Sequence, residues 1–134
     1  MARLIRVLIV LTALLATAAV AAVAHTRYYP TGTSFGYNAA EKDFLGQVNF
    51  PSQGGPCTSG RRVRVFRRRP GPDRLLGQDR SGSHPGDGAG YWVVEVAGIR
   101  PGRFYAVVLR KDVAPGDRHA HICRAYRTSA IPLS

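Results

Sequence analysis

The stretch "RRVRVFRR", Arg61–Arg68, alternates charged and apolar residues with the period of two that is typical of a half-buried β-strand. Val63 and Val65 share one face, and Arg62, Arg64 and Phe66 share the other. An antiparallel sheet commonly has one face on the core and one face in water. The alternation therefore predicts a strand whose valines are buried and whose arginines are solvated.

Similar short runs recur along the chain, separated by turns rich in Gly, Pro, Asp and Ser, and no sustained helical period follows residue 24. Gly46 indicates a bulge or a close backbone approach within its strand, and Ser81–Gly90 is expected to form a long hairpin loop. The expected strands are Thr33–Asn38, Phe44–Phe50, Arg61–Arg68, Asp73–Asp79, Tyr91–Ala97, Gly102–Lys111 and Ala120–Leu133, the last with a bend near Thr128. About seven strands in a chain of this length predict an all-β fold, a single Greek-key β-sandwich over residues 33–134.

The N-terminal 24 residues have the pattern of a secretory signal peptide. Arg3 and Arg6 precede the uncharged run "VLIVLTALLATAAVAAV" at 7–23, and the segment ends in small residues at Ala24. An uncleaved anchor is the alternative, although this run is at the short limit for spanning a bilayer. We expect cleavage after Ala24, a flexible N-terminal arm over 25–32, and a protein that is secreted or held in the cell envelope.

The chain contains two cysteines, Cys57 and Cys123. An even pair in an oxidising compartment predicts one disulfide bond. The spacing excludes a CxxC redox motif, and two cysteines alone do not complete a structural zinc site. Two buried free thiols are the alternative interpretation.

The order of these motifs resembles that of the transthyretin-like, carboxypeptidase-regulatory-like β-sandwich domains, in particular small secreted bacterial domains of that type. The resemblance covers Phe35–Leu133 and rests on "F-x-G-x-V" at Phe44–Val48, Cys57, the arginine-rich strand, "DGAGYWVVEV", "PGRFYAVV" and "CRAYRTSAI". It implies a prealbumin-like fold with one disulfide and an accessory, adhesive or stabilising role. None of these motifs is a catalytic signature. The segments "SHPGDGAG" and "HAHIC" depart from the family pattern.

The formal net charge of +11 directs attention to anionic partners. Arginine pairs bidentately with phosphates, sulfates and carboxylates. The candidate anion-binding residues are Arg61, Arg62, Arg64, Arg67, Arg68 and Arg69, with Arg74 adjoining them. Acidic cell-envelope polymers, lipid headgroups or another surface protein are the expected partners, and a merely solvated strand face is the alternative. A nucleic-acid partner is not expected, because such a surface needs several aromatic residues among the arginines and this run contains only Phe66.

A copper-binding protein or a metal-dependent enzyme is the second hypothesis for function. Cleavage after Ala24 would make His25 the first residue, which offers an amino nitrogen and an imidazole to a metal. His119 and His121 are two residues apart, so on a strand they share a face. Three imidazoles and an amine suit Cu(II) or Zn(II).

Other chemistry has weaker support in the sequence. Ser83 and His84 lie near Asp79 and Asp87 on one loop, without the G-x-S-x-G elbow that exposes a nucleophilic serine. The loop aspartates do not have EF-hand spacing. The sequence therefore predicts a non-enzymatic module that needs no cofactor.

Overall fold

The computed structural model describes residues 26–49, 55–113 and 120–134, and across these ranges the structure is all-β, with no helix. No segment of these ranges forms a helix with the length and apolar character needed to cross a membrane. The strands are β1 (Arg27–Tyr29), β2 (Gly36–Asn38), β3 (Asp43–Gln47), β4 (Arg62–Arg67), β5 (Arg74–Arg80), β6 (Tyr91–Glu95), β7 (Gly102–Val108), β8 (Lys111–Asp112), β9 (His121–Cys123), β10 (Tyr126–Arg127) and β11 (Ile131–Leu133).

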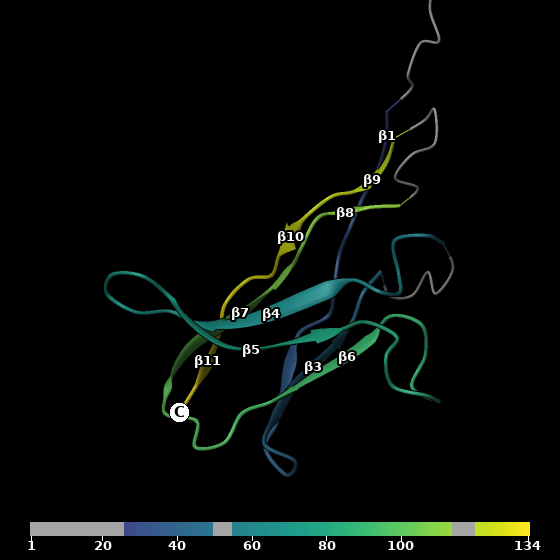
Figure 1. The fold of residues 1–134 in the computed structure, drawn as a ribbon. Helices are drawn as coiled ribbons and strands as arrows, with labels where there is room; N and C mark the ends of the chain where they lie inside the picture. The colour runs from purple at the N-terminus through teal and green to yellow at the C-terminus, as the bar shows by residue number, and fades with distance from the viewer. Residues whose placement is uncertain (1–25, 50–54, 114–119) are drawn as a thin grey trace, which may run out of the picture.

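Two antiparallel sheets form the body of the fold, and a small third sheet extends beyond one end (Figure 1). The large sheet has the order β10-β7-β4-β5, and β11 also pairs with β7. The small sheet has the order β2-β3-β6, and the end sheet has the order β1-β9-β8. Strand β7 is central, as the apolar residues on both of its faces predict. The expected β-sandwich is confirmed at this level, and its Greek-key connectivity stays a prediction.

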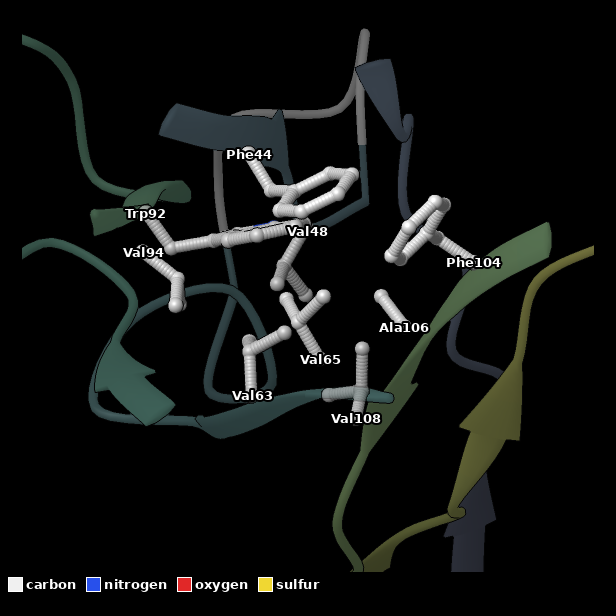
Figure 2. Close-up of a cluster of buried hydrophobic side chains, with 9 residues drawn as sticks. All are labelled: Phe44, Val48, Val63, Val65, Trp92, Val94, Phe104, Ala106 and Val108. Carbon is white, nitrogen blue, oxygen red and sulfur yellow. The ribbon is translucent and has the colours of Figure 1, made fainter. Parts of the chain in front are cut away.

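The core lies between the large and small sheets (Figure 2). Val63 and Val65 of β4 are fully buried there, as the alternation in the arginine-rich stretch predicts. Trp92 of β6 is also fully buried, which confirms that it faces the core with Val94. The cluster consists of Phe44, Val48, Val63, Val65, Trp92, Val94, Phe104, Ala106 and Val108.

Gly46 is a point of close backbone approach, as expected for a glycine within a strand. A Cβ atom at this position would collide with the carbonyl oxygen of Ser34 and would lie 2.7 Å from Cζ2 of Trp92. The absent side chain therefore leaves the space that the Trp92 ring fills.

Four expectations about the elements differ from the structure. Ser81–Gly90 is not a hairpin loop, because β5 belongs to the large sheet and β6 to the small one. The expected strands Gly102–Lys111 and Ala120–Leu133 are divided into shorter strands. Arg27–Tyr29, expected within a flexible arm, pairs in parallel with β9. Turn composition marks where a chain reverses, but it does not determine which sheet the next strand joins.

The disulfide between Cys57 and Cys123 is present, with the two Cα atoms 5.5 Å apart. Both cysteines are buried, and the bond joins the loop before β4 to the end of β9 across a separation of 66 residues. The chain-entropy model assigns about 4 kcal/mol of stabilisation to a loop of that length. Structural disulfides of this kind are typical of proteins in oxidising compartments.

Candidate anion-binding surface

Arg61 is buried, so it does not belong to the anion-binding surface that the sequence predicts. Its side chain has no exposed area, and its guanidinium donates hydrogen bonds to four oxygens at 2.8–3.0 Å. The acceptors are the carbonyls of Cys57, Leu109 and Arg124 and the hydroxyl of Thr31. Burial lowers the pKa of Arg61 from its ordinary value. Four of its five N–H groups are thus oriented toward the protein, where no ligand reaches them.

Arg62 and Arg64 do lie on the outward face of the large sheet, opposite in direction to the buried valines. Their cross-strand partners on β5 are Arg80 and Gln78 respectively. Arg64 Nε donates to Gln78 Oε1 at 3.4 Å. Strand register places two more arginines on this face, from β7 and β10. We call the whole set the outer arginine face: Arg62, Arg64, Arg80, Arg103 and Arg127.

Aromatic rings lie among these arginines. Phe66 and Tyr105 are cross-strand partners whose rings stack with centroids 5.4 Å apart. The guanidinium carbon of Arg127 lies 3.9 Å from the centroid of the Tyr105 ring, a cation–π contact. Tyr105 is buried beneath this stack, so Phe66 is the partly exposed apolar side chain of the outer arginine face.

The carboxylate nearest this stack belongs to Asp73, and it is already engaged. Tyr105 Oη donates to Asp73 Oδ2 at 2.7 Å, and the backbone N–H of Arg69 donates to its other oxygen at 3.1 Å. These two hydrogen bonds lower the pKa of Asp73 below its ordinary value, and the bond from Tyr105 has the larger effect. Arg127 also forms an ion pair with Asp73 at 3.8 Å.

The other arginines of the face have no carboxylate within ion-pair distance among the described residues, where the ion pairs are Asp79–His84 and Asp73–Arg127. Arg62 and Arg80 are directly opposite each other across β4 and β5. Like charges at such positions destabilise a sheet, so an anion between them would relieve repulsion. A shallow depression of about 300 Å³ lies here, lined by both arginines together with Gln78, Asp79 and Ser83.

The remaining predicted arginines are placed elsewhere. Arg67 follows the inward direction of Val63 and Val65, and its Nη2 donates to the carbonyl of Pro101 at 2.6 Å. Arg68 and Arg69 are exposed in the β4–β5 connection. The six candidates are therefore not one site: one is buried, two lie on the outer face, one points inward and two lie on a loop.

The predicted metal site cannot be assembled from the described residues. His25 and His119 lie outside them. His121 is in β9, with Nδ1 3.0 Å from the Tyr29 hydroxyl. Within the described ranges, no group of three or more His, Cys, Asp or Glu side chains could hold a metal ion. The histidine metal site stays a prediction.

Asp79, Ser83 and His84 come together, but not in the order of a hydrolase triad. His84 Nε2 lies 2.9 Å from Asp79 Oδ2, while the Ser83 hydroxyl donates to the carbonyl of Arg80 at 2.7 Å and contacts Asp79 at 3.3 Å. Asp79 Oδ2 also accepts the backbone N–H of Val93 at 2.8 Å. Because β5 and β6 are in different sheets, this carboxylate fastens the two sheets together.

Replacing Asp79 by asparagine is expected to destabilise the protein by about 1–3 kcal/mol at neutral pH. Burial raises the pKa of Asp79, but hydrogen bonds from Val93 and His84 outweigh it, so the net shift is downward from 3.8. A lowered pKa stabilises the fold above the unfolded value, and this contribution is lost as pH falls through the folded value. Urea unfolding of both proteins from pH 7 to pH 3 should show the difference shrinking below about pH 4. A constant difference, or an equal loss in Asp87→Asn, would contradict this role.

The outer arginine face includes three residues that the sequence did not single out: Arg80, Arg103 and Arg127. Each lies on a different strand from the arginine run, and strand register brings them together. The alternation along β5 and β7 indicates that Arg80 and Arg103 face outward. Without the pairing of the strands, that alternation does not identify neighbours across the sheet.

Comparison of the chain with protein-family models, with curated proteins and with solved structures finds no match. The transthyretin-like resemblance therefore stays an expectation from the motifs.

Proposed function

We propose that this protein is a non-catalytic, exported β-sandwich module that binds acidic cell-envelope polymers through the outer arginine face. The observation that supports this most is the clustering of Arg62, Arg64 and Arg80 on one face with no carboxylate in ion-pair contact among the described residues. Exposed arginines more commonly alternate with acidic residues of opposite sign. The net charge, +11 for the full sequence and +9 without residues 1–24, would draw a polyanion toward any part of the surface, and the face would orient it.

The sheet suits repeated anionic groups. Neighbouring strands lie about 4.8 Å apart, so cross-strand arginines can share one phosphate or carboxylate, and successive rows can bind successive groups. Strands are also more rigid than loops, which lowers the entropy lost when side chains bind. The partly exposed Phe66 ring, backed by the buried Tyr105 ring, would contact the apolar faces of a sugar backbone.

Export and family membership belong to the same proposal. The signal-like pattern at 1–24 and the disulfide both favour an oxidising location outside the cytoplasm. An accessory or adhesive role is what the transthyretin-like resemblance implies. Such a role requires a stable surface rather than a catalytic constellation.

The test compares two charge-matched triple variants on immobilised polyphosphate and on immobilised polygalacturonate. Arg62→Gln/Arg64→Gln/Arg80→Gln alters the outer face, and Arg68→Gln/Arg69→Gln/Arg110→Gln removes the same charge from exposed positions elsewhere. We expect the first to bind about tenfold more weakly than wild type in 0.15 M salt, a loss of about 1.4 kcal/mol. The second should change affinity much less.

Equal losses in both triple variants would show that only net charge matters, and the proposed surface would be wrong. Retention of the wild type no greater than that of a charge-matched unrelated protein would overturn the proposal as well. Circular dichroism of each variant checks that the all-β fold is intact.

A further inference from the structure

A second cationic site lies at the seam between β5 and β6, the edge strands of the two sheets. The seam is closed near Asp79, whose carboxylate accepts the N–H of Val93. It is also tight at Gly77, where a Cβ atom would lie 2.6 Å from Cγ1 of Val94. Toward the other end of β5 the two sheets leave a cleft of about 480 Å³. Small-molecule sites in proteins have volumes of about 300–1,000 Å³.

An arginine occupies a position in this cleft where the fold predicts an apolar residue. Arg67 is the third inward position of β4 after Val63 and Val65, and its partner on β7 is the fully buried Phe104. Positions that break the apolar pattern of a core face are commonly functional.

The surroundings hold Arg67 in place. Its Nη2 donates to the Pro101 carbonyl at 2.6 Å, and a Cβ atom on Gly102 would lie 2.8 Å from its Nε. Gly102 therefore leaves room for the guanidinium. The side chain is positioned before any ligand arrives, which reduces the entropy that binding would cost.

The charges of the cleft are unbalanced. Arg74 is the direct cross-strand partner of Arg67, and Arg100 lines the same cleft from the β6–β7 connection. Glu95 is the single carboxylate among the lining residues, and no described carboxylate lies within ion-pair distance of these three arginines. Two arginines opposite each other repel. A compact oxyanion between their guanidinium groups would offset that repulsion.

We propose that this cleft binds a small organic molecule with a phosphate or carboxylate group. The anionic group would pair with Arg67 and Arg74, and the organic part would contact the apolar lining residues Leu76, Ile99 and Phe104. The cleft opens from the inner side of β4, whereas the outer arginine face is on the opposite side. This inference does not depend on the polymer-binding proposal.

The experiment is a calorimetric titration of the intact protein with phenyl phosphate, benzoate and inorganic phosphate. We expect saturable one-site binding of phenyl phosphate or of benzoate, tighter than that of inorganic phosphate, and which of the two binds better identifies the anionic group. Arg67→Gln and Arg74→Gln should each weaken this binding at least tenfold. Arg103→Gln, which removes the same charge from the outer face, should change it less than twofold.

No saturable binding of either organic anion below 10 mM, or equal weakening by Arg103→Gln, would overturn the proposal. Because Arg67 is partly buried, Arg74→Gln at an exposed position keeps the test valid if Arg67→Gln does not fold. The outer-face triple variant, with Arg62, Arg64 and Arg80 replaced, should bind phenyl phosphate normally. Arg74→Gln should likewise retain polymer binding, so the two proposals fail separately.

Discussion

Arg61→Ala is expected to lower the free energy of unfolding by roughly 3–5 kcal/mol. The guanidinium of Arg61 donates hydrogen bonds to three backbone carbonyls, which belong to three separate segments of the chain. Cys57 precedes β4, Leu109 follows β7 and Arg124 follows β9. Removing the side chain leaves these three carbonyls without their charged donor. Arg61 has no exposed area, so the donor is lost in a buried region. Each buried unsatisfied polar group costs about 1–3 kcal/mol, and the costs are not strictly additive.

Guanidinium chloride unfolding measures this loss, with Arg62→Ala as the matched control. Arg62 is adjacent and carries the same charge, but it is exposed, so its replacement should change stability by less than about 0.5 kcal/mol. Arg61→Met should fail to restore stability, because it fills volume but donates no hydrogen bond. A near-native stability for Arg61→Ala would mean that this guanidinium is not needed to satisfy the three carbonyls.

Trp92→Ala is expected to cost about 3–5 kcal/mol through loss of buried apolar area and creation of a cavity. Trp92 is the largest fully buried side chain, and its ring stacks on Phe35 with centroids 6.2 Å apart. Its indole N–H donates to the hydroxyl of Thr33 at 2.9 Å. Gly46 leaves no side chain that could move into the vacated space, so the cavity should collapse only in part.

Thermal and denaturant unfolding of Trp92→Ala and Trp92→Phe separate the two contributions. Trp92→Phe retains an aromatic ring but loses the indole bond and some volume, so we expect a smaller cost than for alanine. Thr33→Val removes the acceptor of the indole N–H, together with the exposed hydrogen bond that the Thr33 hydroxyl donates to the Ser34 carbonyl at 2.9 Å, and should cost about 0.5–1.5 kcal/mol. If Trp92→Ala were near-native in stability, the assignment of this strand face to the core would be wrong.

Arginine has two roles in this chain: Arg61 is a buried hydrogen-bond donor, and Arg62 is a solvated side chain on a strand face. Arg61 and Arg62 are neighbours in the sequence, yet one is fully buried and the other is exposed. Alternation predicts opposite directions for them, and it also places Arg61 on the side of Val63 and Val65. Charge alone nevertheless suggests that the whole arginine run is exposed and forms one cationic surface. Carbonyls from distant segments supply the partners that make burial of Arg61 possible.

Each candidate site likewise combines features that the sequence pattern predicts with features that only strand pairing produces. Arg62 and Arg64 could be assigned to a solvated strand face from the alternation alone. Arg80 and Arg127 join them only because β5 and β10 pair in a particular register. The cleft around Arg67 forms because β5 and β6, which are consecutive in sequence, belong to different sheets. A turn-rich segment between two strands does not reveal that the strands belong to different sheets.

Local patterns in the sequence are enough to predict the all-β class, the buried faces of β4 and β6, the close approach at Gly46 and the disulfide. These features depend on local alternation, on the small size of glycine and on the presence of two cysteines, all of which can be assessed without the rest of the chain. The three-dimensional fold is needed to know which strands share a sheet, which carbonyls bind Arg61, and which arginines meet on the outer face and in the cleft. Those features depend on cross-strand register and on contacts between residues far apart in sequence, which a local pattern does not encode.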